Sequence, residues 1–235
     1  MTSYLPRSKN APTFLRNSEI EEEAALLLAQ FGEQHVYITS PPIPVDEIVE
    51  EHLKLVIEYR DLRAEFPEGD VLGAIWFQNR VIAIDQSLVP EDNPAMRGRY
   101  RFTLAHEIGH WQLHRKLYAA LKNEQLLWSG GSDQPDHVLR SDLSDPKEVQ
   151  ANRFAACLLM PRELVKCEWK REFGGLDPLF LQELRANRSD NAPDEVILDK
   201  AARPLATAFE VSATAMRIRL EGLGLLLRKK EKLLF

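Results

Sequence analysis

The sequence lacks three features that would each assign it to a large class of proteins. No apolar run approaches 18 residues and the first ten residues are polar, so neither a membrane-spanning helix nor a secretory signal is expected. Only two cysteines occur, Cys157 and Cys167, and their apolar surroundings predict small buried side chains rather than a disulfide framework. A formal net charge of −6 excludes a surface built throughout for nucleic acid. We therefore expect a cytoplasmic protein without membrane contact.

The apolar periodicity predicts a mainly helical α+β protein with a small antiparallel or mixed sheet. A chain of 235 residues is long enough to bury a sizeable core. Two runs of β-branched and aromatic residues, Val71–Phe77 and Val81–Ile84, are typical of a hairpin. Helices are predicted after a capping box at Ser18–Glu21 with Gly32 at the end, over Val45–His52, Arg99–His114 and Lys147–Met160, and as two short helices within Pro204–Leu223 with Ser212 as the second N-cap.

Residues 106 to 110, His-Glu-Ile-Gly-His, are the most informative stretch of the chain. Residues four apart share one face of a helix, so His106 and His110 can hold one metal ion from the same side. Glu107 lies beside them and can act on a water molecule without being a ligand. With this composition the pattern arises by chance about 0.015 times per chain, so the motif alone is suggestive. Whether the motif marks a metal site therefore depends on the surrounding sequence.

The third ligand can be sought by geometry, because catalytic zinc sites normally use three protein ligands. His114 lies about 12 Å along the helix axis from His106, so a straight helix cannot bring both to one ion with His110. Glu148 opens the next apolar helix, where a carboxylate needs a reason to be buried. It can equally be a solvated first-turn acid that the helix dipole favours, and the residues alone leave both open. If Glu148 binds the metal, Asn152 can accept a hydrogen bond from the outer nitrogen of His106 or His110.

Several ordered blocks of the chain resemble the ImmA/IrrE family of zinc-dependent metallopeptidases. These blocks are Arg101–His110, Glu148–Ala156, Leu158–Pro161 and the C-terminal stretch from Leu205 to Leu220. The resemblance implies a zincin-like fold with His106, His110 and Glu148 as ligands and Glu107 as base. It also implies a protein substrate, a transcriptional repressor cleaved in a stress or mobile-element response. No sensor domain after the helical part is expected.

On this basis the chain divides into three predicted parts. Residues 1–40 form an N-terminal arm with one helix, residues 41–170 the metallopeptidase core, and residues 171–235 a helical, helix-turn-helix-like part with a basic tail. Zinc is the default metal for such ligands, although manganese or iron suits them too. His114, Tyr118 and residues near His137 are candidates to stabilise the oxyanion. Val81–Ile84 is either an edge strand that pairs with an extended substrate or simply a half-buried strand, and the second interpretation is at least as well supported.

A second class of function rests on the C-terminal helices. Residues 201–235 hold seven basic side chains against three acidic ones, a local charge of +4. A DNA-binding or antitoxin-like regulator without turnover would use such a module, with Arg217 and Arg219 as contacts. We favour the alternative in which these helices pack on the core or dock the protein substrate, because the chain as a whole is acidic.

Overall fold

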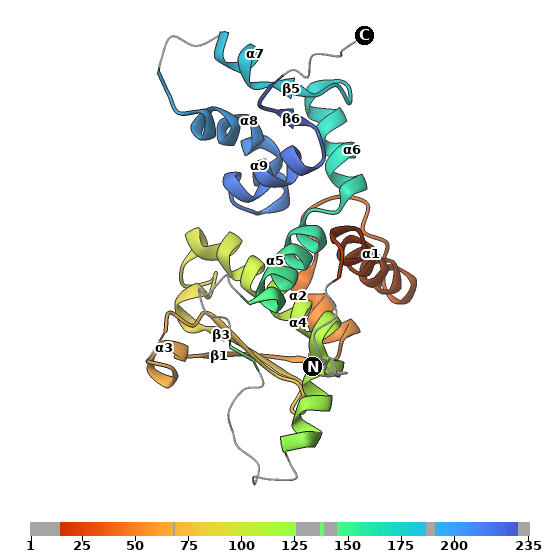
Figure 1. Cartoon of the computed structure of the whole chain (residues 1–235), viewed down its shortest axis with the longest axis vertical. Helices are drawn as coiled ribbons and strands as arrows, with labels where there is room; N and C mark the ends of the chain where they lie inside the picture. The colour runs from red at the N-terminus through yellow and green to blue at the C-terminus, as the bar shows by residue number, and fades with distance from the viewer. Residues whose placement is uncertain (1–14, 68, 126–136, 139–144, 187–190, 230–235) are drawn as a thin grey trace, which may run out of the picture.

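The computed structural model describes residues 15–67, 69–125, 137–138, 145–186 and 191–229. In this part of the chain the fold is mainly helical with a small mixed sheet, as predicted. In the orientation of Figure 1 the sheet and helices α1–α5 occupy the lower half, and α6–α9 occupy the upper half. The helices are α1 (Asn17–Gln34), α2 (Val45–Glu47), α3 (Leu62–Glu65), α4 (Arg97–Gln125), α5 (Pro146–Leu159), α6 (Arg162–Phe173), α7 (Leu181–Ala186), α8 (Asp194–Phe209) and α9 (Ala213–Gly222).

The main sheet has the order β1-β3-β2-β4 and covers one side of α4. Its strands are β1 (Val56–Arg60), β2 (Gly73–Trp76), β3 (Val81–Asp85) and β4 (His137–Val138), while β5 (Leu179–Phe180) and β6 (Leu226–Leu227) form a separate parallel pair. Strands β2 and β3 form the predicted antiparallel hairpin. The prediction that β3 is an edge strand is wrong, because β1 pairs with it in parallel on its other side. An extended substrate therefore cannot add to β3.

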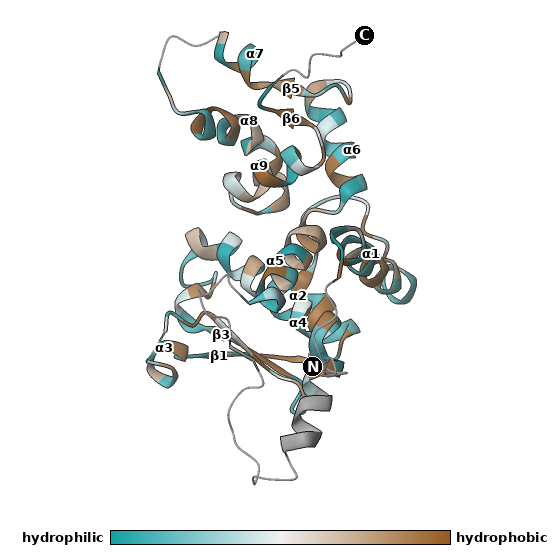
Figure 2. Cartoon of the chain, viewed as in Figure 1, coloured by the Kyte–Doolittle hydropathy of each residue, from teal (hydrophilic) through white to brown (hydrophobic). Residues whose placement is uncertain are grey.

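The core lies mainly between the sheet, α1, α4 and α5. Apolar residues of β2 and β3 are buried on both faces of the sheet, and a smaller cluster around Leu62 and Trp76 covers the face away from α4. Figure 2 shows the same distribution, with hydrophobic residues along the strands and on the inner faces of the helices. Ile20, Ala24 and Phe31 bring α1 into this core, so the N-terminal helix is part of the packed structure.

Several helix boundaries differ from those predicted. Helix α1 begins earlier, and Glu19 rather than Glu21 accepts the reciprocal capping bond, from the backbone nitrogen of Arg16 at 2.6 Å. Gly32 does not end α1, which continues to Gln34. Glu21 is thereby left to make tertiary contacts.

Of the two C-terminal helices, α9 begins where the sequence predicted and α8 does not. The first of these helices was predicted to begin at Pro204, and this is wrong. Helix α8 begins ten residues earlier, at Asp194, and Pro204 lies in its interior. The hydroxyl of Ser212 accepts a bond from the backbone nitrogen of Ala215 at 3.0 Å, so the predicted N-cap of α9 is confirmed. Gly224, with a φ of 72°, follows the end of α9 in the left-handed conformation that glycine tolerates.

The two cysteines are not alike. Cys157 on α5 is buried, as expected, but Cys167 on α6 is exposed, so its apolar neighbours in sequence were misleading. No helix in the described part of the chain combines the length and hydrophobicity that a membrane crossing requires.

Candidate metal centre

The two motif histidines lie on one face of α4 with their outer ring atoms converging. Both side chains are fully buried, and the Nε2 atoms of His106 and His110 are 2.9 Å apart. Their burial follows from the apolar character of α4, which carries Leu104, Ala105 and Ile108 into the core around the motif. The helical spacing of four thus produces the shared face that the sequence predicted.

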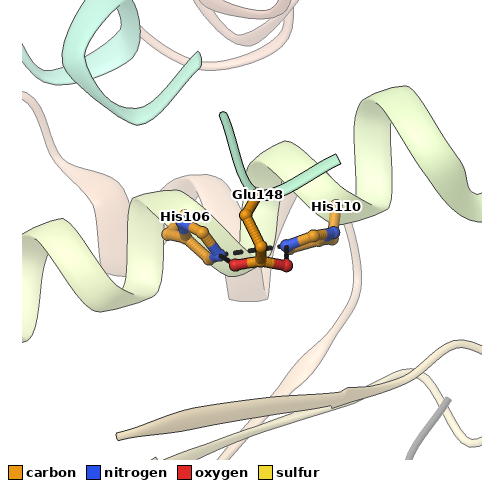
Figure 3. A group of neighbouring side chains, drawn as sticks. All are labelled: His106, His110 and Glu148. Carbon is orange, nitrogen blue, oxygen red and sulfur yellow. Dashed lines mark hydrogen bonds and ion pairs between the residues drawn. The ribbon is translucent and has the colours of Figure 1, made fainter. Parts of the chain in front are cut away.

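Glu148 reaches the same point from the first turn of α5. The Asp145 side chain caps this helix by accepting a bond from the backbone nitrogen of Lys147 at 2.9 Å, which fixes where the first turn begins. The two carboxylate oxygens of Glu148 lie 3.2 Å from His106 Nε2 and 3.3 Å from His110 Nε2. Figure 3 shows the carboxylate between the two rings. At 5% exposure Glu148 is not a solvated first-turn acid.

Helices α4 and α5 can bring these three side chains together because they cross at close range. Gly109 stands at the crossing, and a Cβ atom placed there would lie 3.1 Å from both Cα and the carbonyl oxygen of Ala151. Few real Cβ contacts are so short, so the crossing distance depends on a glycine within the motif and a small residue opposite. The sequence analysis assigned no role to Gly109.

The second ring nitrogen of each histidine, Nδ1, also has a hydrogen-bond contact. His106 Nδ1 lies 3.0 Å from Asn152 Oδ1, which is the contact that the i, i+4 relation of Glu148 and Asn152 predicted. His110 Nδ1 lies 3.0 Å from His114 Nδ1. When Nδ1 donates in such a contact, Nε2 keeps its lone pair and points it toward the shared centre. His114 thus touches a candidate ligand although it cannot reach the metal position itself.

Glu107 is fully buried, and its Oε1 atom lies next to Gly73 of β2. A Cβ atom on Gly73 would lie only 2.6 Å from Glu107 Oε1, so the glutamate occupies a space that exists because β2 has a glycine there. Neither carboxylate oxygen of Glu107 has a hydrogen-bond partner among the described residues. Burial, and then the neighbouring charge of Glu148, raises the pKa of Glu107 well above the ordinary range.

These side chains fit a divalent metal ion. One nitrogen from each of two histidines and one carboxylate oxygen lie within 4.8 Å of one another, and all three residues are buried. This is the donor set of a catalytic zinc site, in which a fourth position stays open. Two buried carboxylates close together are costly without a compensating cation, and a dication would supply the missing charge.

The structure gives other contacts for Tyr118 and His137, and the further candidates near His137, in 126–136 and 139–144, lie outside the described residues. The ring of Tyr118 stacks on Phe77 with 5.0 Å between centroids, and Lys147 Nζ lies 5.4 Å from the centre of the Tyr118 ring. The backbone of His137 pairs with Ile75 in the sheet. The rings of His35 and His52 lie beside Phe31.

The basic residues proposed for DNA contact are engaged within the protein. Arg217 pairs with Asp199 at 2.6 Å and with Glu221 at 2.8 Å. Arg219 pairs with Glu21 of α1 at 2.6 Å and donates to the carbonyl oxygen of Met160 at 2.9 Å. A local charge of +4 in the sequence therefore does not translate into free cations at these two positions.

The arrangement is typical of a metallopeptidase. It combines two histidines four apart on a helix, a glutamate within the motif, an acidic residue from the next helix and a small mixed sheet. The model of the IrrE N-terminal-like domain, a peptidase family, matches residues 57–221, and the chain belongs to this family. No curated protein sequence matches it. A solved Mycobacterium tuberculosis transcriptional regulator is similar over 88% of this chain and 58% of its own length, with 15% identity and a TM-score of 0.48. The chain thus spans little more than half the length of that protein.

Proposed function

We propose that the protein is a zinc-dependent endopeptidase that cleaves a DNA-binding transcriptional repressor in a stress or mobile-element response. One observation carries the enzymatic part: two buried histidines and a buried glutamate present three ligand atoms to one point, with a second buried glutamate beside them. The repressor and the biological setting rest on the resemblance to the ImmA/IrrE family.

In this proposal His106, His110 and Glu148 hold the metal, and Asn152 and His114 orient the histidine rings. When bound there, zinc would supply Lewis-acid chemistry: it would lower the pKa of a water molecule toward about 7 and polarise a carbonyl group. The carboxylate of Glu107 is not one of the three converging ligands and remains available for proton transfer. It accepts the proton of the attacking water on an Oε atom and later donates it to the departing amine. Complete burial of Glu107 keeps bulk water from competing for that proton.

The enzymatic part is tested with Glu107→Gln, which removes the base but keeps the shape. We expect about one zinc per chain by elemental mass spectrometry and a fall in peptide cleavage of at least about 10²-fold. Glu168→Gln is a matched control, because Glu168 is also a buried glutamate but lies on α6 and pairs with Arg171. Full cleavage by Glu107→Gln, or a wild-type chain that binds no divalent metal, would exclude the proposed mechanism.

The substrate is tested separately. The protein is incubated with the DNA-binding protein encoded beside it, and the fragments are mapped by mass spectrometry. A single cleavage that requires Glu107 and is blocked by a chelator supports the repressor as substrate. If an unstructured protein such as casein is cleaved while the repressor stays intact, the repressor is not the substrate, and the proposed peptidase activity still stands.

A further inference from the structure

We infer that the cavity between α4–α5 and α8–α9 is a binding site for a small amphipathic anion, with an apolar body and one carboxylate or phosphate group. The cavity has a volume of about 1120 Å³ and lies at the junction of the two halves seen in Figure 1. This is slightly above the range of about 300–1,000 Å³ that is typical of small-molecule sites.

The walls of the cavity are largely apolar. They include two of the large hydrophobic residues that the fold leaves exposed, Val149 at 50% and Ile218 at 59%. Phe102 of α4, Val211 before α9 and Ala215 of α9 continue the same surface. Hydrophobic side chains that gather at one exposed place, rather than singly, are typical of a binding site.

The charges of the lining select an anion. Four arginines and one glutamate line the cavity, although the whole chain carries a net charge of −6. Three of the arginines have carboxylate neighbours: Arg97 is 3.3 Å from Glu210, Arg219 is 2.6 Å from Glu21 and Arg99 is 3.9 Å from Asp70.

The fourth arginine, Arg153 of α5, has no such neighbour in the part of the chain that the structure describes. A guanidinium at the border of an apolar cavity binds a carboxylate or phosphate through two parallel hydrogen bonds. An aliphatic or aromatic body attached to that anion would then lie along Val149 and Ile218.

The chain's own first residues do not match this cavity by charge. Residues 1–14 contain Arg7 and Lys9 and no acidic residue, so a basic lining would repel them. Duplex DNA carries the right charge, but its phosphates have no apolar body to cover the hydrophobic walls. An amphipathic anion satisfies both the arginine and the apolar surface.

The cavity also reaches the proposed metal site, and this second part of the inference rests on the proposed function. Asn152 lines the cavity, and its Oδ1 atom is 3.0 Å from His106 Nδ1. An occupant that packs against Asn152 restricts it to the conformation that holds His106. Binding in the cavity and binding of the metal should therefore strengthen each other, because such linkage is reciprocal.

Decanoate and decyltrimethylammonium, two amphiphiles of opposite charge whose alkyl tails differ by one carbon, test the binding site by titration calorimetry of the metal-free chain. We expect decanoate to bind at one site per chain at least tenfold more tightly than the cation. Decyl phosphate, run in parallel, distinguishes a carboxylate site from a phosphate site. Equal affinity for both charges would overturn the assignment of an anion, and absence of binding by all three would overturn the site.

Thiol labelling locates the bound molecule, because the chain supplies a reporter and its own control. Cys157 lines the cavity and Cys167 is exposed on α6 outside it. Decanoate should slow modification of Cys157 by methyl methanethiosulfonate at least fivefold and change that of Cys167 by less than twofold. Equal rates at Cys157 with and without bound decanoate would place the ligand elsewhere.

Substitutions then test the charge and the coupling. Arg153→Gln should weaken decanoate binding about tenfold, and Ile218→Glu should make the cavity bind the cation more tightly than the anion. Arg203→Gln is the control, because Arg203 is an exposed arginine of α8 outside the cavity lining, and its decanoate affinity should match that of wild type. In chelator competition, decanoate should raise zinc affinity at least threefold in wild type and not in Asn152→Ala. Unchanged zinc affinity in wild type would remove the coupling but not the binding site. If only the cleavage assays fail, the proposed peptidase function is contradicted and the anion-binding site is not.

Discussion

Helix α5 has two interfaces that are built in opposite ways. Against α4 it packs so closely that a methyl group at Gly109 would lie only 3.1 Å from the backbone of Ala151. Against α8 and α9 it leaves a cavity of about 1120 Å³. Around this cavity, arginine–carboxylate pairs join neighbouring helices: Arg219 of α9 pairs with Glu21 of α1, and Arg101 of α4 pairs with Glu210 at the end of α8. The close interface fixes three ligand atoms, which requires backbone contact. The open interface tolerates an occupant, because long charged side chains can adjust.

The largest effect should come from breaking the close interface with Gly109→Ala. The added methyl group would lie 3.1 Å from the backbone of Ala151, and we expect the required adjustment to lower the free energy of unfolding by about 1–3 kcal/mol and to shift Glu148 relative to the histidines. Chemical denaturation and metal content measure the two effects.

Gly222→Ala is the matched control for this change, since a Cβ atom there meets nothing within 4 Å on α9. That variant should be neutral or more stable by up to about 1 kcal/mol, because alanine has the higher helix propensity. Wild-type metal binding by Gly109→Ala would show that the close crossing does not position the ligands.

A smaller effect is expected from the residues behind the histidines. Asn152→Ala and His114→Leu each remove a contact to an outer ring nitrogen and should weaken zinc binding by about 10–100-fold with little change in stability. His114→Gln can still hydrogen bond and should recover part of the affinity. Competition with a chelator measures this, and equal loss in His114→Gln and His114→Leu would assign His114 a packing role.

The smallest effect concerns the open interface. Partial burial acts to raise the pKa of Glu21, but hydrogen bonds from Arg162 and Arg219 together outweigh it and lower that pKa. The unfolded chain therefore binds this proton more readily, so the stabilisation by Glu21 is present above pH 4.5 and is lost as the pH falls through the folded pKa.

Glu21→Gln should accordingly lower stability at pH 7 by up to about 1 kcal/mol and narrow the gap to wild type in acid. Glu163→Gln, at an exposed pair with Lys166 on α6, should change little. Thermal unfolding at pH 7 and pH 3.5 compares the variants. A gap that grows in acid would contradict the direction of the pKa shift.

Much of the candidate site follows from local sequence, because helical spacing alone places His106 beside His110 and Asn152 one turn after Glu148. The roles of Gly109 and Gly73 could not be predicted, since each depends on a distant segment approaching the backbone. His114 was expected to be a packing or substrate-side residue and a candidate to stabilise the oxyanion, and its contact with His110 Nδ1 became visible once ring orientations were fixed.

The errors have a similar origin. The position of β3 inside the sheet depends on its parallel pairing with β1, which lies far earlier in the chain. Arg219 looked like a free cation because its partner, Glu21, is nearly two hundred residues away. The sequence analysis had used Glu21 to start α1 instead. Long-range pairing, rather than secondary structure, is therefore what the sequence left open.

The contact between Gly73 and Glu107 has a consequence for redesign. The floor beneath the proposed base is main chain, and main chain keeps its shape when neighbouring side chains are exchanged. Under the proposed function, substitutions of the side chains around Glu107 should alter which peptide is accepted without moving the base. At position 73 itself no residue larger than glycine leaves the base its space, so a library for new specificity should vary the surroundings and hold this position constant.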